Sequence, residues 1–211
     1  MHVSRGLLVA FDGVDGAGKT TQAERLAAAL KRDGRRVRVL REPGGTALGE
    51  QLRAVLLAAD GQADEPLVQA CLFMASRRQL VVEAIRPALA QGDTVFLDRS
   101  FLSTWVYQGV VGGVELELLE ALARAAHGDA WPDQVLLLDL SAEEADGRRA
   151  GRGAADDSFE ARGFDYLEHI AQAYRDMAAR LPELVTSIPA GGDPDDVAAR
   201  CRAAFDEVAA R

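Results

Sequence analysis

The sequence predicts a single α/β domain in which helices flank a doubly wound, five-stranded parallel sheet. Short apolar runs alternate with long helical stretches along the chain, a pattern typical of parallel sheets that are covered on both faces. A chain of 211 residues with 48% hydrophobic content can bury one large core. We find no linker or internal repeat that would divide it, so residues 1–211 are expected to form one domain.

Five runs rich in Leu, Val, Ile and Phe are the predicted strands. They span residues 7–11, 36–40, 94–97 and 135–140, with a weaker run at 184–188. Helices are predicted where apolar residues recur at helical spacing, over 21–33, 46–59, 65–91, 115–126, 158–179 and 194–210. The segment 146–157 is rich in Gly, Ala and Arg and poor in large apolar residues, so we predict a mobile loop or lid there.

The most specific motif joins the first predicted strand to the first predicted helix. Gly13 to Thr20 reads GVDGAGKT and matches the phosphate-binding P-loop pattern G-x-x-x-x-G-K-[ST]. Glycines let the backbone close around an anion, and the following helix adds the positive end of its dipole. Lys19 supplies a mobile cation and the Thr20 hydroxyl a ligand for Mg²⁺. The predicted ATP-binding residues are Gly13, Asp15, Gly16, Ala17, Gly18, Lys19, Thr20 and Thr21.

Two further motifs follow the second and third predicted strands, whose carboxyl ends lie at the ligand-binding edge of such a sheet. Arg41 to Thr46 reads REPGGT, which by itself could be a turn with Thr46 capping the next helix. Asp98 can hold Mg²⁺ through water, and Arg99 can bind a phosphate through two hydrogen bonds. A structural ion pair is the alternative for these two residues.

Polar and aromatic side chains also share faces of two predicted helical segments. One face carries Ser103, Thr104, Tyr107 and Gln108, which recur at offsets of three and four residues. These groups could form hydrogen bonds to a ligand, or they could be an ordinary polar face. On the long helix, Phe73 could stack on a base while Arg77 reaches the polar edge of that base, although packing in the core is the alternative for Phe73.

Together, these motifs resemble those of the thymidylate kinase family of P-loop nucleoside monophosphate kinases. The matching segments are FDGVDGAGKTTQ, REPGGT, LFMASRRQLV, LDRS with ST–YQG, and the arginine-rich segment before residue 158. They occur in the family's order from residue 11 to about 180. The resemblance implies transfer of the ATP γ-phosphoryl group to dTMP, in dTTP biosynthesis, with Mg²⁺ as the metal. It also implies a P-loop NTPase fold of the nucleotide kinase type, a short lid and a homodimer.

The resemblance also assigns roles in a dTMP site. The implied residues are Asp15, Glu42, Pro43, Arg53, Phe73, Arg77, Arg99, Ser103, Thr104, Tyr107 and Gln108. Asp15 resembles the residue that reads the 3′-hydroxyl, while Arg53 and Arg99 hold the acceptor phosphate. Phe73 stacks on thymine, Arg77 bonds a thymine carbonyl, and Thr104 with Gln108 reads the rest of the base edge. Tyr107 crowds C2′ and so disfavours a ribose, and Glu42 is expected near the monophosphate, where it organises Mg²⁺ or water.

A catalytic arginine lies either in the P-loop or in the lid of family members. Here Ala17 occupies the P-loop position, while Arg148, Arg149 and Arg152 lie in the segment 146–157, so the chain resembles the bacterial, lid-arginine type. The predicted catalytic residues are Lys19, Arg99 and one of these three arginines, and the predicted metal ligands are Thr20 and Asp98. The sequence departs from the family pattern at Ser100, Trp105, Ser158, Ala171 and Pro189.

Charge and composition limit the other classes of function. A net charge of −9 argues against general binding to nucleic acid or to an anionic membrane. The sequence lacks a run of 18 apolar residues and a secretory leader, so we expect a soluble, cytoplasmic protein with buried thiols at Cys71 and Cys201. Two alternatives stay open: a P-loop kinase for another nucleotide or a deoxynucleoside, and a P-loop regulatory ATPase.

Overall fold

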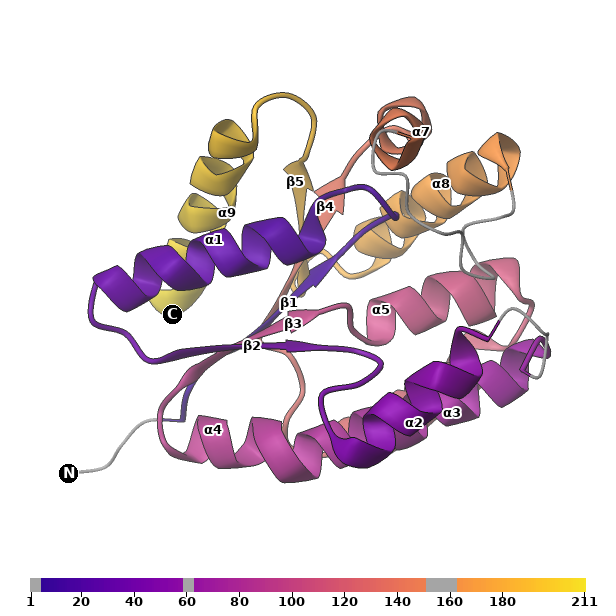
Figure 1. Ribbon diagram of the computed structural model, residues 1–211, viewed down its shortest axis with the longest axis horizontal. Coiled ribbons are helices and arrows are strands. Elements are labelled where there is room, and N and C mark those ends of the chain that lie inside the picture. Colours follow the sequence, from indigo (N-terminus) through magenta and orange to yellow (C-terminus); the bar gives the residue numbers. More distant parts are fainter. Residues whose placement is uncertain (1–4, 59–62, 151–162) are drawn as a thin grey trace.

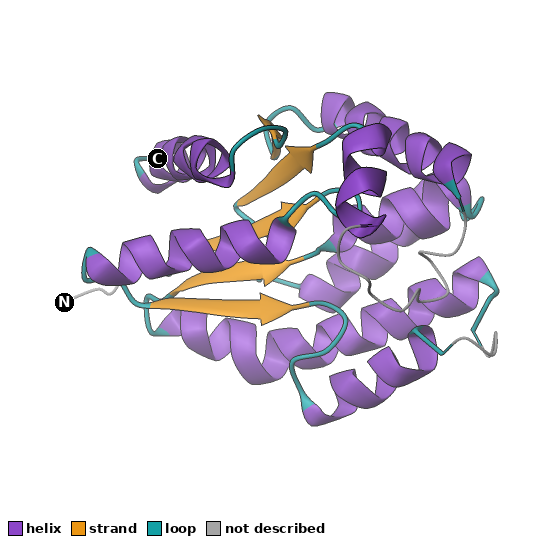
Figure 2. Ribbon diagram, turned by 45° about the horizontal axis from the view of Figure 1, so that its top comes forward, coloured by secondary structure: helices purple, strands orange, loops and turns teal. Residues whose placement is uncertain are grey.

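The computed structural model describes residues 5–58, 63–150 and 163–211. Its centre is a five-stranded sheet in the order β2-β3-β1-β4-β5. The strands are β1 (Leu8–Asp12), β2 (Val37–Arg41), β3 (Thr94–Asp98), β4 (Gln134–Asp139) and β5 (Val185–Pro189). Every pair of neighbours is parallel, and the arrows in Figure 2 point the same way. The predicted fold class is confirmed.

Helices cover both faces of this sheet (Figure 1). The helices with α geometry are α1 (Lys19–Arg32), α2 (Ala47–Leu56), α3 (Pro66–Leu80), α4 (Arg86–Ala90), α5 (Phe101–Thr104), α6 (Leu116–His127), α7 (Ala142–Ala150), α8 (Phe164–Arg180) and α9 (Pro194–Ala209). Helices α1 and α9 pack together on one face, while α4 and α8 contact β3 and β4 from the other. None of the described helices is both long and apolar enough to span a membrane.

The central strand β1 is buried along its whole length because β3 and β4 flank it and helices cover it above and below. That environment explains why its sequence is an almost continuous apolar run. Phe11 on β1 makes an edge contact with Phe96 on β3, with 5.4 Å between ring centroids. Phe96 in turn meets Phe205 on α9 at 5.6 Å, so aromatic rings tie this helix to the middle of the sheet.

Two helical runs contain a wider, π-helical stretch. The predicted helix 65–91 is observed as α3, then η1 (Val81–Ile85), then α4. Pro87 in α4 cannot donate a backbone hydrogen bond and its ring crowds the preceding turn, so the turn just before it widens. The second run is α5 followed by η2 (Trp105–Val111), which carries the polar face predicted at residues 103–108.

Two local predictions were wrong. The loop predicted at 146–157 is helical as far as residue 150, because Ser141 caps α7 by accepting from the Glu144 N–H at 3.2 Å, and Ala and Arg favour helix. Residues 151–157 of the predicted lid, and 158–162 of the predicted helix 158–179, lie outside the described residues. Cys71 is exposed rather than buried because it lies on the outer side of α3, whereas Cys201 is buried as predicted.

Candidate active site

A cavity of about 370 Å³ opens beyond the carboxyl ends of β1, β2 and β3. All the side chains predicted to bind dTMP line it, together with Gly16, Gly18, Lys19, Thr20, Thr21 and Asp98 from the other predictions. Its lining also includes Arg41, Leu57 and Ser100. The edge of a parallel sheet where loops from neighbouring strands meet is where ligands bind in this kind of fold. The predicted residues, although distant in sequence, therefore share one cavity.

The P-loop, which connects β1 to α1, packs tightly against the elements on its β4 side. Gly13 has a φ of 138°, and a Cβ there would lie 2.6 Å from the Leu138 carbonyl oxygen. Gly16 has a φ of 92°, and a Cβ there would lie 2.8 Å from the Ala145 carbonyl oxygen. Both positions therefore require glycine. Gly13 and Ala17 do not line the cavity, and the Ala17 side chain is buried.

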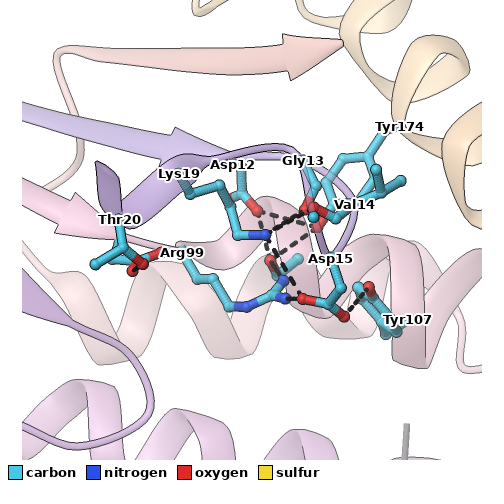
Figure 3. A network of polar contacts seen from close by, with 12 residues as sticks. Asp12, Gly13, Val14, Asp15, Lys19, Thr20, Arg99, Tyr107 and Tyr174 are labelled. Atoms are coloured by element: carbon cyan, nitrogen blue, oxygen red, sulfur yellow. Dashed lines mark hydrogen bonds and ion pairs between the residues drawn. The ribbon is translucent and has the colours of Figure 1, made fainter. Parts of the chain in front are cut away.

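The ammonium of Lys19 lies inside the turn of the P-loop (Figure 3). Its Nζ donates to the carbonyl oxygens of Gly13 at 3.0 Å and Val14 at 2.9 Å, and lies 3.7 Å from a carboxylate oxygen of Asp15. Burial, followed by the positive charge of Arg99, lowers the pKa of Lys19, and nearby carboxylates oppose this shift. The side chain is thus held next to the site of phosphate binding by backbone acceptors.

Arg99 lines the cavity beside Lys19 and Asp15 (Figure 3). Its Nη2 donates to one oxygen of Asp15, and Tyr107 donates to the other oxygen at 3.3 Å. Its Nη1 donates to Ser103 Oγ at 3.0 Å, and its guanidinium lies 5.7 Å from the centre of the Tyr107 ring. Burial and the Asp15 charge raise the pKa of Tyr107, so its hydroxyl stays a donor.

At the other end of the cavity, Glu42 and Arg77 form a buried ion pair. Arg77 Nε donates to Glu42 Oε2 at 2.6 Å, and Arg77 Nη2 donates to Thr104 Oγ1 at 3.3 Å. Burial raises the pKa of Glu42 and the adjacent guanidinium opposes that shift. Glu42 was expected to organise Mg²⁺ or water near the monophosphate. In the structure the Glu42 carboxylate pairs with Arg77 and fixes the orientation of that guanidinium. The expected role of Glu42 near the monophosphate stays a prediction.

The remaining predicted side chains complete this end of the cavity. Gln108 Nε2 donates to Gln69 Oε1 at 2.9 Å, which fixes the Gln108 amide. Arg53 Nη1 donates to the Pro43 carbonyl oxygen at 3.1 Å, so α2 is tied to the loop after β2. Phe73 is half-buried and lines the cavity, so it is not a core residue. The ring, the amide and the guanidinium of Arg77 together form a wall suited to a planar, polar-edged ring.

Comparisons with known proteins agree with this arrangement. The family model for thymidylate kinase matches residues 11–200. The chain belongs to the thymidylate kinase family. The thymidylate kinase of Verminephrobacter eiseniae is 43% identical over 193 residues, which cover 88% of this chain and 84% of that protein. The one from Desulfosudis oleivorans is 40% identical over 208 residues, covering 96% and 97%.

A solved structure supports the same assignment. The crystal structure of thymidylate kinase from Ehrlichia chaffeensis superposes with a TM-score of 0.75 at 28% identity, covering 95% of this chain and 99% of that one. A thymidylate kinase is a nucleoside monophosphate kinase, and this chain is therefore an ATP-dependent phosphotransferase that phosphorylates dTMP. Neither alternative suggested by the sequence gains support from these matches.

The structure describes some of the residues predicted to bind metal or to act from the lid of this thymidylate kinase. The Thr20 hydroxyl donates to Asp98, so the two predicted metal ligands are in contact. Arg148 extends from α7 to the P-loop, where Nη1 lies 3.5 Å from the Gly16 carbonyl oxygen and Nη2 donates to Ala190 at 3.0 Å. Arg152 and the side chain of Arg149 lie outside the part of the chain that the structure describes.

Sequence reasoning missed two residues behind the cavity, Asp12 and Tyr174. Asp12 is the last residue of β1 and is fully buried, and Tyr174 on α8 donates to it at 3.0 Å. A carboxylate at the end of an otherwise apolar strand was a signal that could have identified Asp12. Nothing in the local sequence of α8 indicates that Tyr174 points toward it.

Proposed function

We propose that this thymidylate kinase binds ATP phosphates on its P-loop and dTMP in the part of the cavity between α3, α5 and η2. The observation that carries the acceptor assignment is the buried Glu42–Arg77 ion pair. Arg77 Nε donates to Glu42 Oε2 at 2.6 Å, and Arg77 lines the cavity together with Thr104 and Gln108. A fixed donor of this kind suits a carbonyl on a base edge. Phe73 stacks on that base, and Tyr107 restricts the space beside the sugar.

The phosphate end of the acceptor lies against Arg99 and Arg53, and the 3′-hydroxyl lies against Asp15. A monophosphate oxygen is already anionic at neutral pH, so the reaction needs no general base. Catalysis then depends on alignment of the two substrates and on neutralising the charge of the transferring group. Lys19, Arg99 and a lid arginine perform that second task.

Thr20 at the start of α1 and Asp98 at the end of β3 fit a Mg²⁺ ion. Thr20 and Asp98 present oxygen atoms in direct contact with each other, and oxygen is the donor that Mg²⁺ prefers. Within the described residues there is no group of three His, Cys, Asp or Glu side chains that could hold a metal ion by themselves. Few protein ligands match a Mg²⁺ ion that keeps waters and substrate phosphates as its other ligands. When bound, the ion would neutralise charge on the ATP phosphates.

The test is an ADP-release assay with ATP and Mg²⁺ and one acceptor at a time. We expect fast turnover with dTMP, slower turnover with dUMP, and negligible turnover with UMP, CMP, AMP, GMP or thymidine. Arg53→Ala should raise the KM for dTMP, whereas a kinase that uses a neutral hydroxyl as acceptor would not depend on Arg53. Rapid phosphorylation of thymidine would overturn the assignment of the acceptor site.

We also propose that the protein is a homodimer that associates through α2 and α3. Leu48 and Val55 on α2, and Val68 on α3, are large apolar side chains exposed on these packed helices. Light scattering after size exclusion should give twice the mass of the chain, and Val68→Asp should give a monomer. A monomeric parent protein would contradict this proposal. The cytoplasmic location stays a prediction from the sequence.

A further inference from the structure

The carboxylate of Asp12 connects the end of β1 to the elements that carry Arg99. Its Oδ2 accepts from the Ser100 backbone N–H at 3.0 Å and from the Ser100 hydroxyl at 2.7 Å. Its Oδ1 accepts from Ser103 and from Tyr174, the latter at 3.0 Å. Asp12 is fully buried, and Figure 3 shows Tyr174 pointing toward it from α8. One carboxylate therefore holds α5 and α8 against β1.

The charge of Asp12 gives this network a fixed direction. An ionised carboxylate only accepts hydrogen bonds, so the hydroxyl protons of Ser103 and Tyr174 both point toward it. Burial and the Asp12 charge raise the pKa of Tyr174, which keeps its hydroxyl protonated. Because Ser103 donates its single proton to Asp12, its oxygen is left to accept from Arg99 Nη1 at 3.0 Å.

The backbone of Arg99 needs such support. Its φ of 74° places it in the left-handed region, which disfavours a residue with a side chain. The Arg99 N–H donates to the Phe11 carbonyl oxygen at 2.9 Å, and the next N–H, that of Ser100, donates to Asp12. Hydrogen bonds on both sides of the strained residue thus tie it to the end of β1. A residue in such a strained backbone conformation persists where several surrounding contacts hold it in place.

We propose that Asp12 is a positioning residue that sets the orientation of Arg99, acting through Ser100 on the backbone and through Ser103 on the guanidinium. Ser100, a departure from the family pattern, serves twice, because its hydroxyl donates to Asp12 and also accepts from the Leu102 N–H at 3.2 Å as the cap of α5. The inference rests on the proposed role of Arg99 as a ligand of the acceptor phosphate. Asp12 itself does not line the cavity.

The first test is Asp12→Asn, which keeps the shape of the side chain but introduces an NH₂ group among donors. We expect the KM for dTMP to rise about tenfold or more, with a lower kcat. Losing a hydrogen bond to a charged group would let Arg99 move, and the free energy of such a bond corresponds to about a tenfold change in affinity. The KM for ATP should stay within about twofold. A purely structural role would lower the melting temperature without a selective change in the KM for dTMP.

The matched control is Asp139→Asn. Asp139 ends the neighbouring strand β4 and forms a 2.9 Å ion pair with Arg175, also on α8, but this pair is exposed to solvent. We expect this variant to keep the parental KM for dTMP. A rise in that KM equal to the one in Asp12→Asn would overturn the proposal, because any charge change at a strand end would then have the same effect.

A double-mutant cycle separates the inference from the proposed function. Arg99→Ala should raise the KM for dTMP strongly, and adding Asp12→Asn to Arg99→Ala should raise it no further, because Asp12 acts through Arg99. Effects that multiply in the double variant would overturn the positioning role. If Arg99→Ala left the KM for dTMP unchanged, the phosphate-binding role of Arg99 would fail instead.

Two milder variants keep the proposal testable if Asp12→Asn does not fold. Ser100→Ala removes the hydroxyl donor but keeps the backbone N–H, and Tyr174→Phe removes one donor to Oδ1 while filling the same space. Each should raise the KM for dTMP a few-fold and leave the KM for ATP unchanged. An unchanged KM for dTMP in both folded variants would overturn the proposal.

Discussion

The carboxyl edge of the sheet has two sides, one beyond β2 and β3 and the other beyond β4 and β5, and they hold their charged side chains in different ways. Beyond β2 and β3, the pair that faces the proposed base site is buried: Glu42 and Arg77 contact each other and both side chains are less than 5% exposed. Beyond β4 and β5, exposed arginines contact backbone carbonyls or single carboxylates. Arg200 donates to Pro189 at 2.7 Å, and Arg175 pairs with Asp139 across 2.9 Å with both side chains at least a third exposed.

This difference matches the tasks proposed for the two sides. The side beyond β2 and β3, where we propose that dTMP binds, is the acceptor side. It must distinguish one base and one sugar from several similar ones, which requires groups with fixed positions. The donor side is where we propose that the ATP phosphates bind. Every nucleoside triphosphate shares these phosphates, so backbone N–H groups and mobile cations are sufficient there. The P-loop lies between the two sides. Lys19 donates to the P-loop carbonyl oxygens of Gly13 and Val14, and it also lies near the carboxylate of Asp15, which we propose contacts dTMP.

The largest effect is expected where the two sides meet. Lys19→Ala should lower kcat by about 10³-fold or more, because it removes the cation that we propose neutralises the transferring phosphate. Lys31→Ala is a matched control, since it removes the other lysine of the chain from the exposed end of α1. Steady-state kinetics and thermal unfolding would be measured together. A kcat near that of the parent protein for Lys19→Ala would show that the P-loop lysine is not needed.

A smaller effect should show how rigidly the acceptor side is built. Arg77→Met leaves the buried Glu42 carboxylate without its partner, which costs about 3–5 kcal/mol of unfolding free energy when the charge stays uncompensated. The neighbouring Arg78 is exposed and donates to the Ala126 carbonyl oxygen at 3.3 Å, so Arg78→Met should cost less than about 1 kcal/mol. Urea denaturation would measure both. Equal losses would mean that the buried pair contributes no more than a surface arginine.

The smallest effect concerns His127, which packs against Phe101 and Trp131 behind the acceptor side. Burial and the nearby charge of Arg77 lower its pKa from 6.5 to about 3. Below pH 6.5 the unfolded chain binds a proton here that the folded chain does not, so the unfolding free energy should fall as the pH drops from 6.5 to 5. The slope should approach about 1.4 kcal/mol per pH unit at the lower end of this range. His127→Asn should reduce that slope.

The control for this prediction is His169→Asn, which changes an exposed histidine on α8. Unfolding would be followed in urea at several pH values for all three proteins. If the slope between pH 6.5 and 5 were the same with and without His127, the ring would not be held in its neutral form by the folded protein.

Local motifs predicted the fold and most of the cavity, because their chemistry depends on residues that are close in sequence. The P-loop pattern, REPGGT and the polar face at 103–108 each fix their own geometry, and the parallel sheet brings their ends together. The hydrogen bonds of Asp12 could not be predicted in this way. Its partners Ser100 and Tyr174 are 88 and 162 residues away in the sequence, so only the packing of α5 and α8 on β1 reveals them.

The extent of α7 and the exposure of Cys71 were missed for related reasons. Gly, Ala and Arg give no strong periodic pattern, so helix and loop are hard to distinguish until a cap such as Ser141 is seen in place. Cys71 lies in an apolar helical pattern, but α3 buries only part of its surface. Which side of a helix faces the core depends on its neighbours and not on its own composition.

The different environments of the two cysteines have a practical consequence. Burial raises the pKa of Cys201 to about 11, so its thiol is both inaccessible and protonated at neutral pH. Cys71 is exposed on α3. A thiol-reactive dye should therefore label the single chain at one position. Because Cys71 lies three residues after Val68 on the helix proposed to form the dimer contact, dimer formation should slow that labelling. The labelling rate could then report on association without engineering a cysteine into the protein.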